Sequence, residues 1–98
     1  MELHKLKIKN KYYQDIYYGD KTFELRKDDR NYQVGDLIEF TIIDSVPETD
    51  EKNDKSVSIG VTANCLYKIT YILKDVPEYG LDKDYCIFGI EKLDIRNY

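Results

Sequence analysis

Apolar and polar residues alternate from Val57 to Leu73, and this run constrains the fold more than any other feature of the chain. Aliphatic, cysteine and tyrosine side chains occupy one phase of the run, and most residues of the other phase are polar. A period of two is typical of a half-buried β-strand, yet strands average about five to six residues. The run therefore predicts either one long curling strand or two strands joined by a bulge or turn near Ala63 and Asn64. Curling favours a barrel.

Shorter segments predict the remaining elements. Residues 3–9 alternate, with His4 and two aliphatic residues on one face of a strand and three lysines on the other. Asn10 can cap a two-turn helix that ends at Gly19, with tyrosines in its apolar stripe. Polar and turn-forming residues separate three further strands from one another, at 21–27, 37–43 and 85–93, and a turn or short helix is expected at 76–80.

These elements predict a single α+β domain that spans residues 1–98. The expected architecture is a small, mostly antiparallel barrel of five to six strands, with a helix after the first strand covering one opening. Of the 98 residues, 42% are hydrophobic and 35% charged, which is typical of a soluble globular chain. No apolar run approaches the roughly 18 residues of a membrane-spanning helix. We therefore expect a cytoplasmic protein with no membrane partner.

Metal and disulfide chemistry have little support. The two cysteines, Cys65 and Cys86, lack CxxC spacing and are expected to be buried thiols, with a disulfide as the alternative. His4 is the sole histidine, so a zinc site has almost nothing to be built from. Solvated surface carboxylates are the commoner explanation for the acidic residues that can supply oxygen ligands, namely Asp20, Glu24, Asp28 and Asp29. We expect no metal and no cofactor.

Charge is unevenly distributed along the chain. Residues 1–35 hold eight Lys/Arg and six Asp/Glu, whereas the remainder holds seven and thirteen, for a net charge of −4. Acidic residues are concentrated in the segment 44–56, which is expected to be a mobile surface loop. A chain without a global basic footprint is not a general duplex-DNA coat protein. Any nucleic-acid contact must be a local patch, and a small or single-stranded ligand is favoured.

The segment from Gly19 to Arg26 concentrates reactive side chains at a helix-to-strand junction. Alternation places Thr22, Glu24 and Arg26 on one strand face, just after Lys21. A guanidinium two residues from a carboxylate can grip phosphate, and the carboxylate can accept from an exocyclic amine. The alternative is an exposed strand face on which these charges merely pair, contributing well under about 1 kcal/mol.

The stretch GDKTFELR resembles the Gly-x-Lys-x-x-Glu-x-Arg motif of the ASCH domain, a PUA-like barrel family associated with RNA. The likeness continues through FELRKDDRNYQVGD, YKITYIL and GLDKDYCIFGI, which look like a small bacterial and phage ASCH-like family. The resemblance implies an RNA-binding module with a nucleotide cleft between helix and barrel. Lys21, Glu24 and Arg26 would line this cleft, Arg30 would border it, and His4 would stack or hydrogen-bond near it.

Other side chains have two readings each. Exposed tyrosines can stack on unpaired bases, and the candidates are Tyr12, Tyr18 and Tyr32. By contrast, Tyr67 and Tyr71 lie on the apolar face of a strand and are expected in the core or at its rim. The lysines at 5, 7 and 9 can touch phosphates, or can defend an exposed sheet edge.

Two further functions stay open at this stage. One branch of small ASCH-like proteins resembles an amidohydrolase that deacylates N4-acetylcytidine with a motif lysine and a threonine three residues later. Lys21 matches that lysine, but Glu24 replaces the threonine, so an enzyme here would use Lys21 as nucleophile or base, Glu24 as its partner and Thr22 to position a modified nucleoside. The other alternative is a phage or bacterial regulatory module whose acidic loop meets a basic protein partner.

Overall fold

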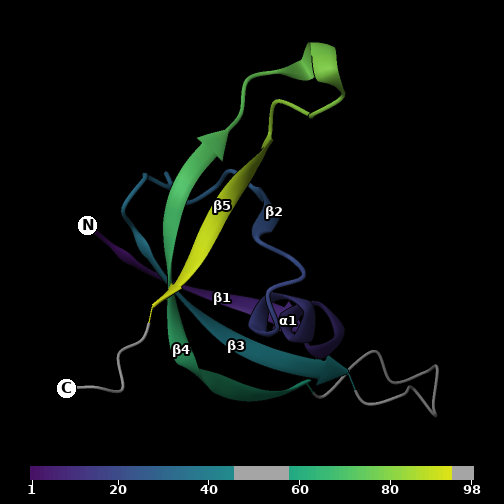
Figure 1. Cartoon of the computed structure of the whole chain (residues 1–98). Helices are drawn as coiled ribbons and strands as arrows, with labels where there is room; N and C mark the ends of the chain where they lie inside the picture. Colours follow the sequence, from purple (N-terminus) through teal and green to yellow (C-terminus); the bar gives the residue numbers. More distant parts are fainter. Residues whose placement is uncertain (46–57, 94–98) are drawn as a thin grey trace, which may run out of the picture.

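The computed structural model describes residues 1–45 and 58–93. Five strands and one α-helix form the described domain, and a 3-10 turn lies in the connection between the last two strands (Figure 1). In chain order they are β1 (Leu3–Lys9), α1 (Asn10–Tyr17), β2 (Phe23–Lys27), β3 (Leu37–Ser45), β4 (Ser58–Leu73), η1 (Pro77–Tyr79) and β5 (Tyr85–Leu93).

The five strands form one mixed sheet in the order β1-β3-β4-β5-β2, which curls into a half-barrel (Figure 1). The β1–β3 pair is parallel, because the helix and β2 intervene in the chain, and the other three pairs are antiparallel. The predicted class, a small α+β fold with a mostly antiparallel sheet, is confirmed. The barrel is not continuous, however, since β1 and β2 are the two edge strands of the sheet.

The helix α1 packs on β1 and β3 through its buried residues Tyr13 and Ile16. The Tyr13 ring lies edge-on to Phe40 and Tyr67, at centroid distances of 5.8 and 6.3 Å. The expected cap at Asn10 is wrong: Lys9 takes the N-cap position without a side-chain hydrogen bond, and Asn10 is already helical. Tertiary packing of an apolar face, and not a cap, therefore stabilises this short helix.

The core follows the alternation of the strands. On β1 the apolar phase is buried and the three lysines are exposed, as predicted. Cys86 is buried and burial raises the pKa of its thiol to about 11, whereas Cys65 is only partly buried; neither forms a disulfide. The core comprises Leu6, Ile8, Tyr13, Ile16, Tyr32, Ile38, Phe40, Tyr67, Ile69, Cys86, Phe88 and Ile90.

The long alternating run is one strand, β4, interrupted by two register shifts. One shift lies opposite β3 in the predicted region, where β4 residues 62–66 face only residues 39–41. The second inserts Thr70 between Ile69 and Tyr71 relative to β5. An extra residue reverses the phase of a strand, so Ile69 is buried whereas Tyr71 is 65% exposed. The expectation that Tyr71 lies in the core or at its rim is therefore wrong.

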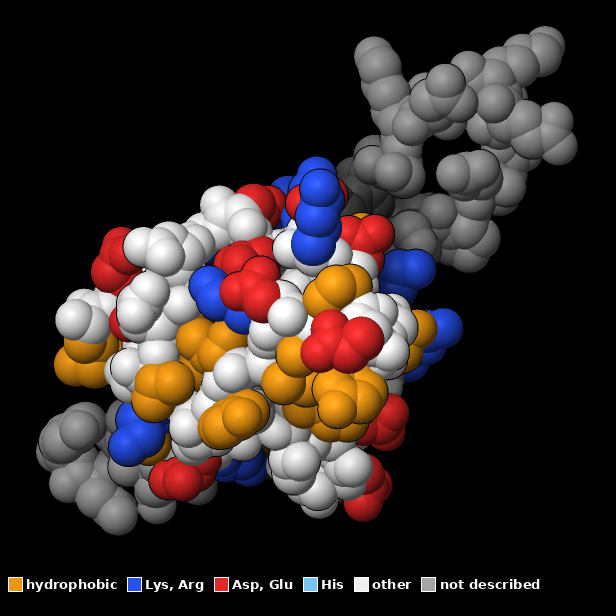
Figure 2. All heavy atoms as spheres, turned by 90° about the horizontal axis from the view of Figure 1, so that it is seen from above, with side chains coloured by type: hydrophobic (Ala, Val, Ile, Leu, Met, Phe, Trp, Pro, Cys, Tyr) orange, Lys and Arg blue, Asp and Glu red, His pale blue; other side chains and the backbone are white. Residues whose placement is uncertain are grey.

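Strand β2 is unusual because its apolar side chains face solvent and a charged side chain is buried. Its apolar side chains, Phe23 and Leu25, are 46% and 54% exposed, whereas the carboxylate of Glu24 is buried. Hydrophobic side chains are also visible on the surface seen from the η1 end (Figure 2). A buried charge on an edge strand needs partners nearby, which directs attention to the surroundings of Glu24.

Most of the acidic segment 44–56, which was expected to be a loop, lies outside the described residues. Within the described part of the chain, no helix is long and apolar enough to cross a membrane.

Candidate functional site

The connection between α1 and β2 places Lys21 beside Glu24. Gly19 has φ 86°, in the left-handed region that favours glycine, and so turns the chain after the helix. The Lys21 backbone N–H then donates to the Asp15 carbonyl at 2.9 Å, which holds the connection against the helix. The turn and this hydrogen bond therefore fix the position of Lys21 relative to the helix, two residues before β2 begins.

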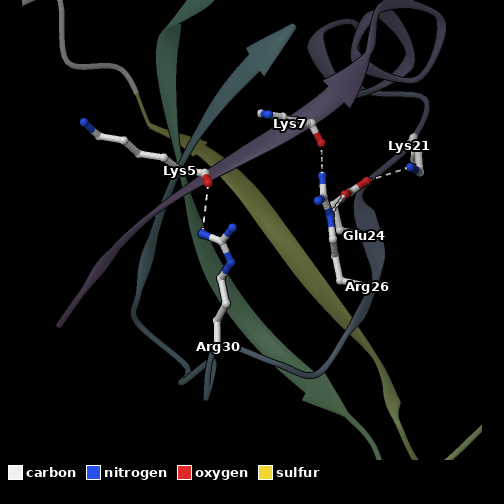
Figure 3. A network of polar contacts seen from close by, with 6 residues as sticks. All are labelled: Lys5, Lys7, Lys21, Glu24, Arg26 and Arg30. Atoms are coloured by element: carbon white, nitrogen blue, oxygen red, sulfur yellow. Dashed lines mark hydrogen bonds and ion pairs between the residues drawn. The ribbon is translucent and has the colours of Figure 1, made fainter. Parts of the chain in front are cut away.

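Glu24 is the centre of a three-residue ion cluster, shown in Figure 3. Its side chain is 5% exposed, and each oxygen accepts one charged hydrogen bond, from Lys21 Nζ to Oε1 at 2.8 Å and from Arg26 Nε to Oε2 at 2.8 Å. The side chains of Lys21 and Arg26 remain 20% and 24% exposed. Both oxygens of the buried carboxylate thus have a hydrogen-bond donor, while the two cationic side chains that supply these donors remain partly exposed to solvent.

Two arginines bridge the open edges of the half-barrel. The Arg26 guanidinium extends from β2 to donate Nη2–H to the Lys7 carbonyl of β1, and Arg30, in the loop after β2, donates Nη1–H to the Lys5 carbonyl at 3.0 Å (Figure 3). We call the space between the two edge strands the β1–β2 seam. Side-chain bonds, and not backbone pairing, hold this seam together.

A pocket of about 540 Å³ opens along the seam. It is bounded by β1 and the start of α1 on one side and by β2 and the first residue of β5 on the other. Its lining combines cations, aromatic rings and a single carboxylate: Lys7, Ile8, Lys9, Tyr12, Lys21, Phe23, Glu24, Leu25, Arg26, Lys27 and Tyr85. Charged recognition and ring stacking are both available in one hollow.

Two rings flank the Lys21 ammonium. Its nitrogen lies 5.2 Å from the Tyr12 ring centroid and 5.5 Å from that of Phe23. Cation–π contacts at such distances contribute about 0.5–1 kcal/mol at exposed sites. The exposed faces of Tyr12 and Phe23 are consequently fixed next to a positive charge.

Three other residues expected at the site lie elsewhere or at its border. Thr22 is exposed outside the pocket lining, and its backbone carbonyl accepts from the Ile90 N–H at 3.0 Å. Arg30 borders the seam through Lys5. His4 lies in a separate buried cluster, where Nε2 is 2.8 Å from Asp36 Oδ2.

The His4–Asp36 cluster is closed to solvent. The two side chains are 6% and 5% exposed, and Tyr32 covers the imidazole at a centroid distance of 4.8 Å. Asp36 also accepts from the backbone N–H groups of Glu2 and Gln33, each at 3.0 Å. Burial by itself would raise the pKa of Asp36, but these hydrogen bonds together lower it below its usual value.

Tyr32 was a candidate for base stacking, and this expectation is wrong. Its ring is 3% exposed, because it packs between His4 and Phe88. Tyr12 and Tyr18 are exposed at 45% and 74%. Only Tyr12 of the three lines the pocket.

The sequence did not point to Tyr85 or Lys27. They are cross-strand neighbours in the β2–β5 register, but 58 positions separate them in the chain. The signal that could have found them is the pairing of the strand after the motif with the last strand, which a single sequence does not specify. Among the described residues, no group of three or more His, Cys, Asp or Glu side chains is placed to hold a metal ion.

Comparison with known proteins gives one family. The family model described as a domain of unknown function (DUF3850) matches residues 3–90. The comparison with curated proteins finds no match. The matched stretch runs from the first residue of β1 into β5, so it includes the whole β1–β2 seam. The chain therefore belongs to the DUF3850 family.

Proposed function

We propose that this protein is an RNA-binding module of the ASCH type, a PUA-like fold, and that it recognises a nucleotide in the seam pocket. The observation that carries the proposal is the charge of the lining. Five of the lining residues are Lys or Arg and one is acidic, in a chain whose net charge is −4. A local concentration of cations on an acidic protein favours a phosphate-bearing ligand of limited size.

The cations of the lining have different availability. Lys21 and Arg26 are engaged by Glu24, whereas Lys7, Lys9 and Lys27 are exposed and form no ion pair with any described residue. The exposed lysines are therefore the groups that contact phosphate. Lys21 and Arg26 hold the Glu24 carboxylate in place through their ion pairs.

The aromatic rings supply the second half of the argument. Tyr12, Phe23 and Tyr85 line the pocket and are 45%, 46% and 42% exposed. Stacking of a base on such a ring contributes about 1–3 kcal/mol and tolerates any base. Glu24 adds selectivity, because each carboxylate oxygen retains a lone pair able to accept from a base amine.

The cluster argues against the amidohydrolase alternative. Lys21 Nζ is hydrogen-bonded to Glu24 at 2.8 Å and lies 5.2 and 5.5 Å from two ring centroids, so the side chain is engaged by neighbours and is not positioned as a free nucleophile. In a binding role the same side chain holds Glu24 in place in the pocket lining.

A titration tests this proposal. Labelled protein is mixed with each of the four ribonucleoside monophosphates, with a short single-stranded RNA and with N4-acetylcytidine, while backbone NMR peaks are followed. We expect shifts confined to residues 7–12, 21–27 and Tyr85, with no conversion of the nucleoside. Lys7→Gln and Lys27→Gln should each weaken nucleotide binding about fivefold, whereas Lys83→Gln, at an exposed lysine outside the pocket lining, should not.

The outcomes separate the candidate functions. Silence from every nucleotide and from the RNA would refute the proposal and favour a protein-interaction module. Release of cytidine from N4-acetylcytidine would instead establish an enzyme.

A further inference from the structure

Strand β1 carries a row of cations that extends beyond the pocket. Lys5, Lys7 and Lys9 are exposed and alternate along the strand, so successive ammonium groups leave the backbone at intervals of about 6.6 Å. Successive phosphates of an extended single strand are spaced comparably. Lys7 and Lys9 line the pocket, whereas Lys5 lies outside its lining.

The structural explanation for such a row is protection of a sheet edge. Lysines on an edge strand deter pairing with another chain, and β1 is an edge strand. In this fold the edge is already occupied, because the carbonyls of Lys5 and Lys7 accept from Arg30 and Arg26. Figure 3 shows the Lys5 and Lys7 side chains extending away from these guanidinium groups. Because the two arginines already cover this edge, edge protection does not explain the row of lysines.

We infer that the β1 lysine row binds consecutive phosphates of a single-stranded RNA, one base of which enters the seam pocket. The inference rests on the proposed function and specifies its substrate: a strand and not a free nucleotide. The strand leaves the pocket along β1, passes Lys9 and Lys7, and reaches Lys5 beside Arg30. Arg30 strengthens the positive field at this end while its guanidinium stays bonded to the Lys5 carbonyl.

An acidic side chain is the cross-strand neighbour of the row. Glu39 of β3 is the register partner of Lys5 in the parallel β1–β3 pair. A carboxylate at this position lowers the local positive potential. It also provides a variant whose effect should have the opposite sign from loss of a lysine.

The experiment measures binding by fluorescence anisotropy for ribonucleotides of one to four residues and one base type, at several salt concentrations. We expect affinity to rise with length. Lys5→Gln should weaken tetranucleotide binding about fivefold and lower its salt slope by about 0.7, the value for one lost single-strand contact. Mononucleotide binding should stay unchanged. Glu39→Gln should strengthen tetranucleotide binding, and Lys83→Gln, at a lysine outside β1, should leave both ligands unaffected.

Failure of the row and failure of the pocket give different results. If mononucleotides bind but affinity does not rise with length, or if Lys5→Gln behaves as wild type, the lysine row is not a phosphate track and the pocket remains. If no ribonucleotide of any length binds, the proposed function fails and the row fails with it.

Discussion

Among the residues that the structure describes, the carboxylates of Asp36 and Glu24 are buried with cationic or hydrogen-bonding partners, and they differ in what surrounds them. Asp36 is enclosed: His4 bonds to it, Tyr32 covers His4, and both ionisable side chains are at most 6% exposed. Glu24 is equally buried, but Lys21 and Arg26 are 20% and 24% exposed and line a pocket of about 540 Å³. Similar pairing chemistry therefore lies closed inside the fold at one place and borders an open pocket at the other.

The closed cluster should be the more costly one to break. Asp36→Ala leaves His4 and two backbone N–H groups buried without an acceptor, so we expect a loss of about 3 kcal/mol in the free energy of unfolding. Urea denaturation followed by circular dichroism measures it. Asp29→Ala, which removes an exposed carboxylate from the same loop, should change stability by less than about 0.5 kcal/mol. Equal effects of the two variants would contradict a structural role for Asp36.

The closed cluster should also contribute to acid sensitivity. The pKa of Asp36 is lowered in the folded state from 3.8, so the unfolded chain takes up the proton first as the pH falls. Its stabilising contribution is complete above about pH 3.8 and is lost as the pH falls through the lowered value. Asp36→Asn cannot titrate, and its stability should fall less steeply than that of the wild type below pH 4.

Urea midpoints measured from pH 5 to pH 2 for both proteins give the comparison. The difference between the two curves removes the contribution of the other carboxylates. Parallel curves would show that Asp36 titrates alike in the folded and unfolded chains.

The sequence predicted the strands well because their signal is local. The alternation of residues 3–9 and of residues 37–43 specifies both the strand and its buried face. On β2 the same alternation separates Phe23 and Leu25 from Glu24 but does not say which side is buried. That choice depends on β1, whose Lys7 carbonyl lies within reach of Arg26 but 19 positions earlier in the chain.

The site was predictable as a cluster but not as a pocket. The spacing of Lys21, Glu24 and Arg26 requires only one turn and one strand, so a local motif suffices to bring them together. Assigning Tyr32 to a stacking role failed because its burial depends on contacts with His4 and Phe88, which come from distant strands. The same dependence on long-range pairing concealed Tyr85 and the exposure of Tyr71.

The open cluster offers the test that separates stability from recognition. Glu24→Gln keeps the shape of the side chain and one acceptor oxygen, and Lys21 and Arg26 can turn their exposed groups to water. We therefore expect a loss of only about 1 kcal/mol in the free energy of unfolding, less than for Asp36→Ala. Nucleotide binding should change more than stability, because an amide presents a donor where a base amine requires an acceptor. The affinities of the Glu24→Gln variant for the four monophosphates, measured by NMR titration, should differ less from one another than those of the wild type.

A matched variant and the opposite outcome complete this comparison. Glu78→Gln removes an exposed carboxylate in η1, so it should leave both stability and nucleotide preference unchanged. A loss of stability in Glu24→Gln as large as that in Asp36→Ala, with nucleotide preference retained, would place Glu24 in the same structural class as Asp36. Recognition would then depend on the exposed lysines and rings alone, because these are the lining groups that no buried carboxylate holds.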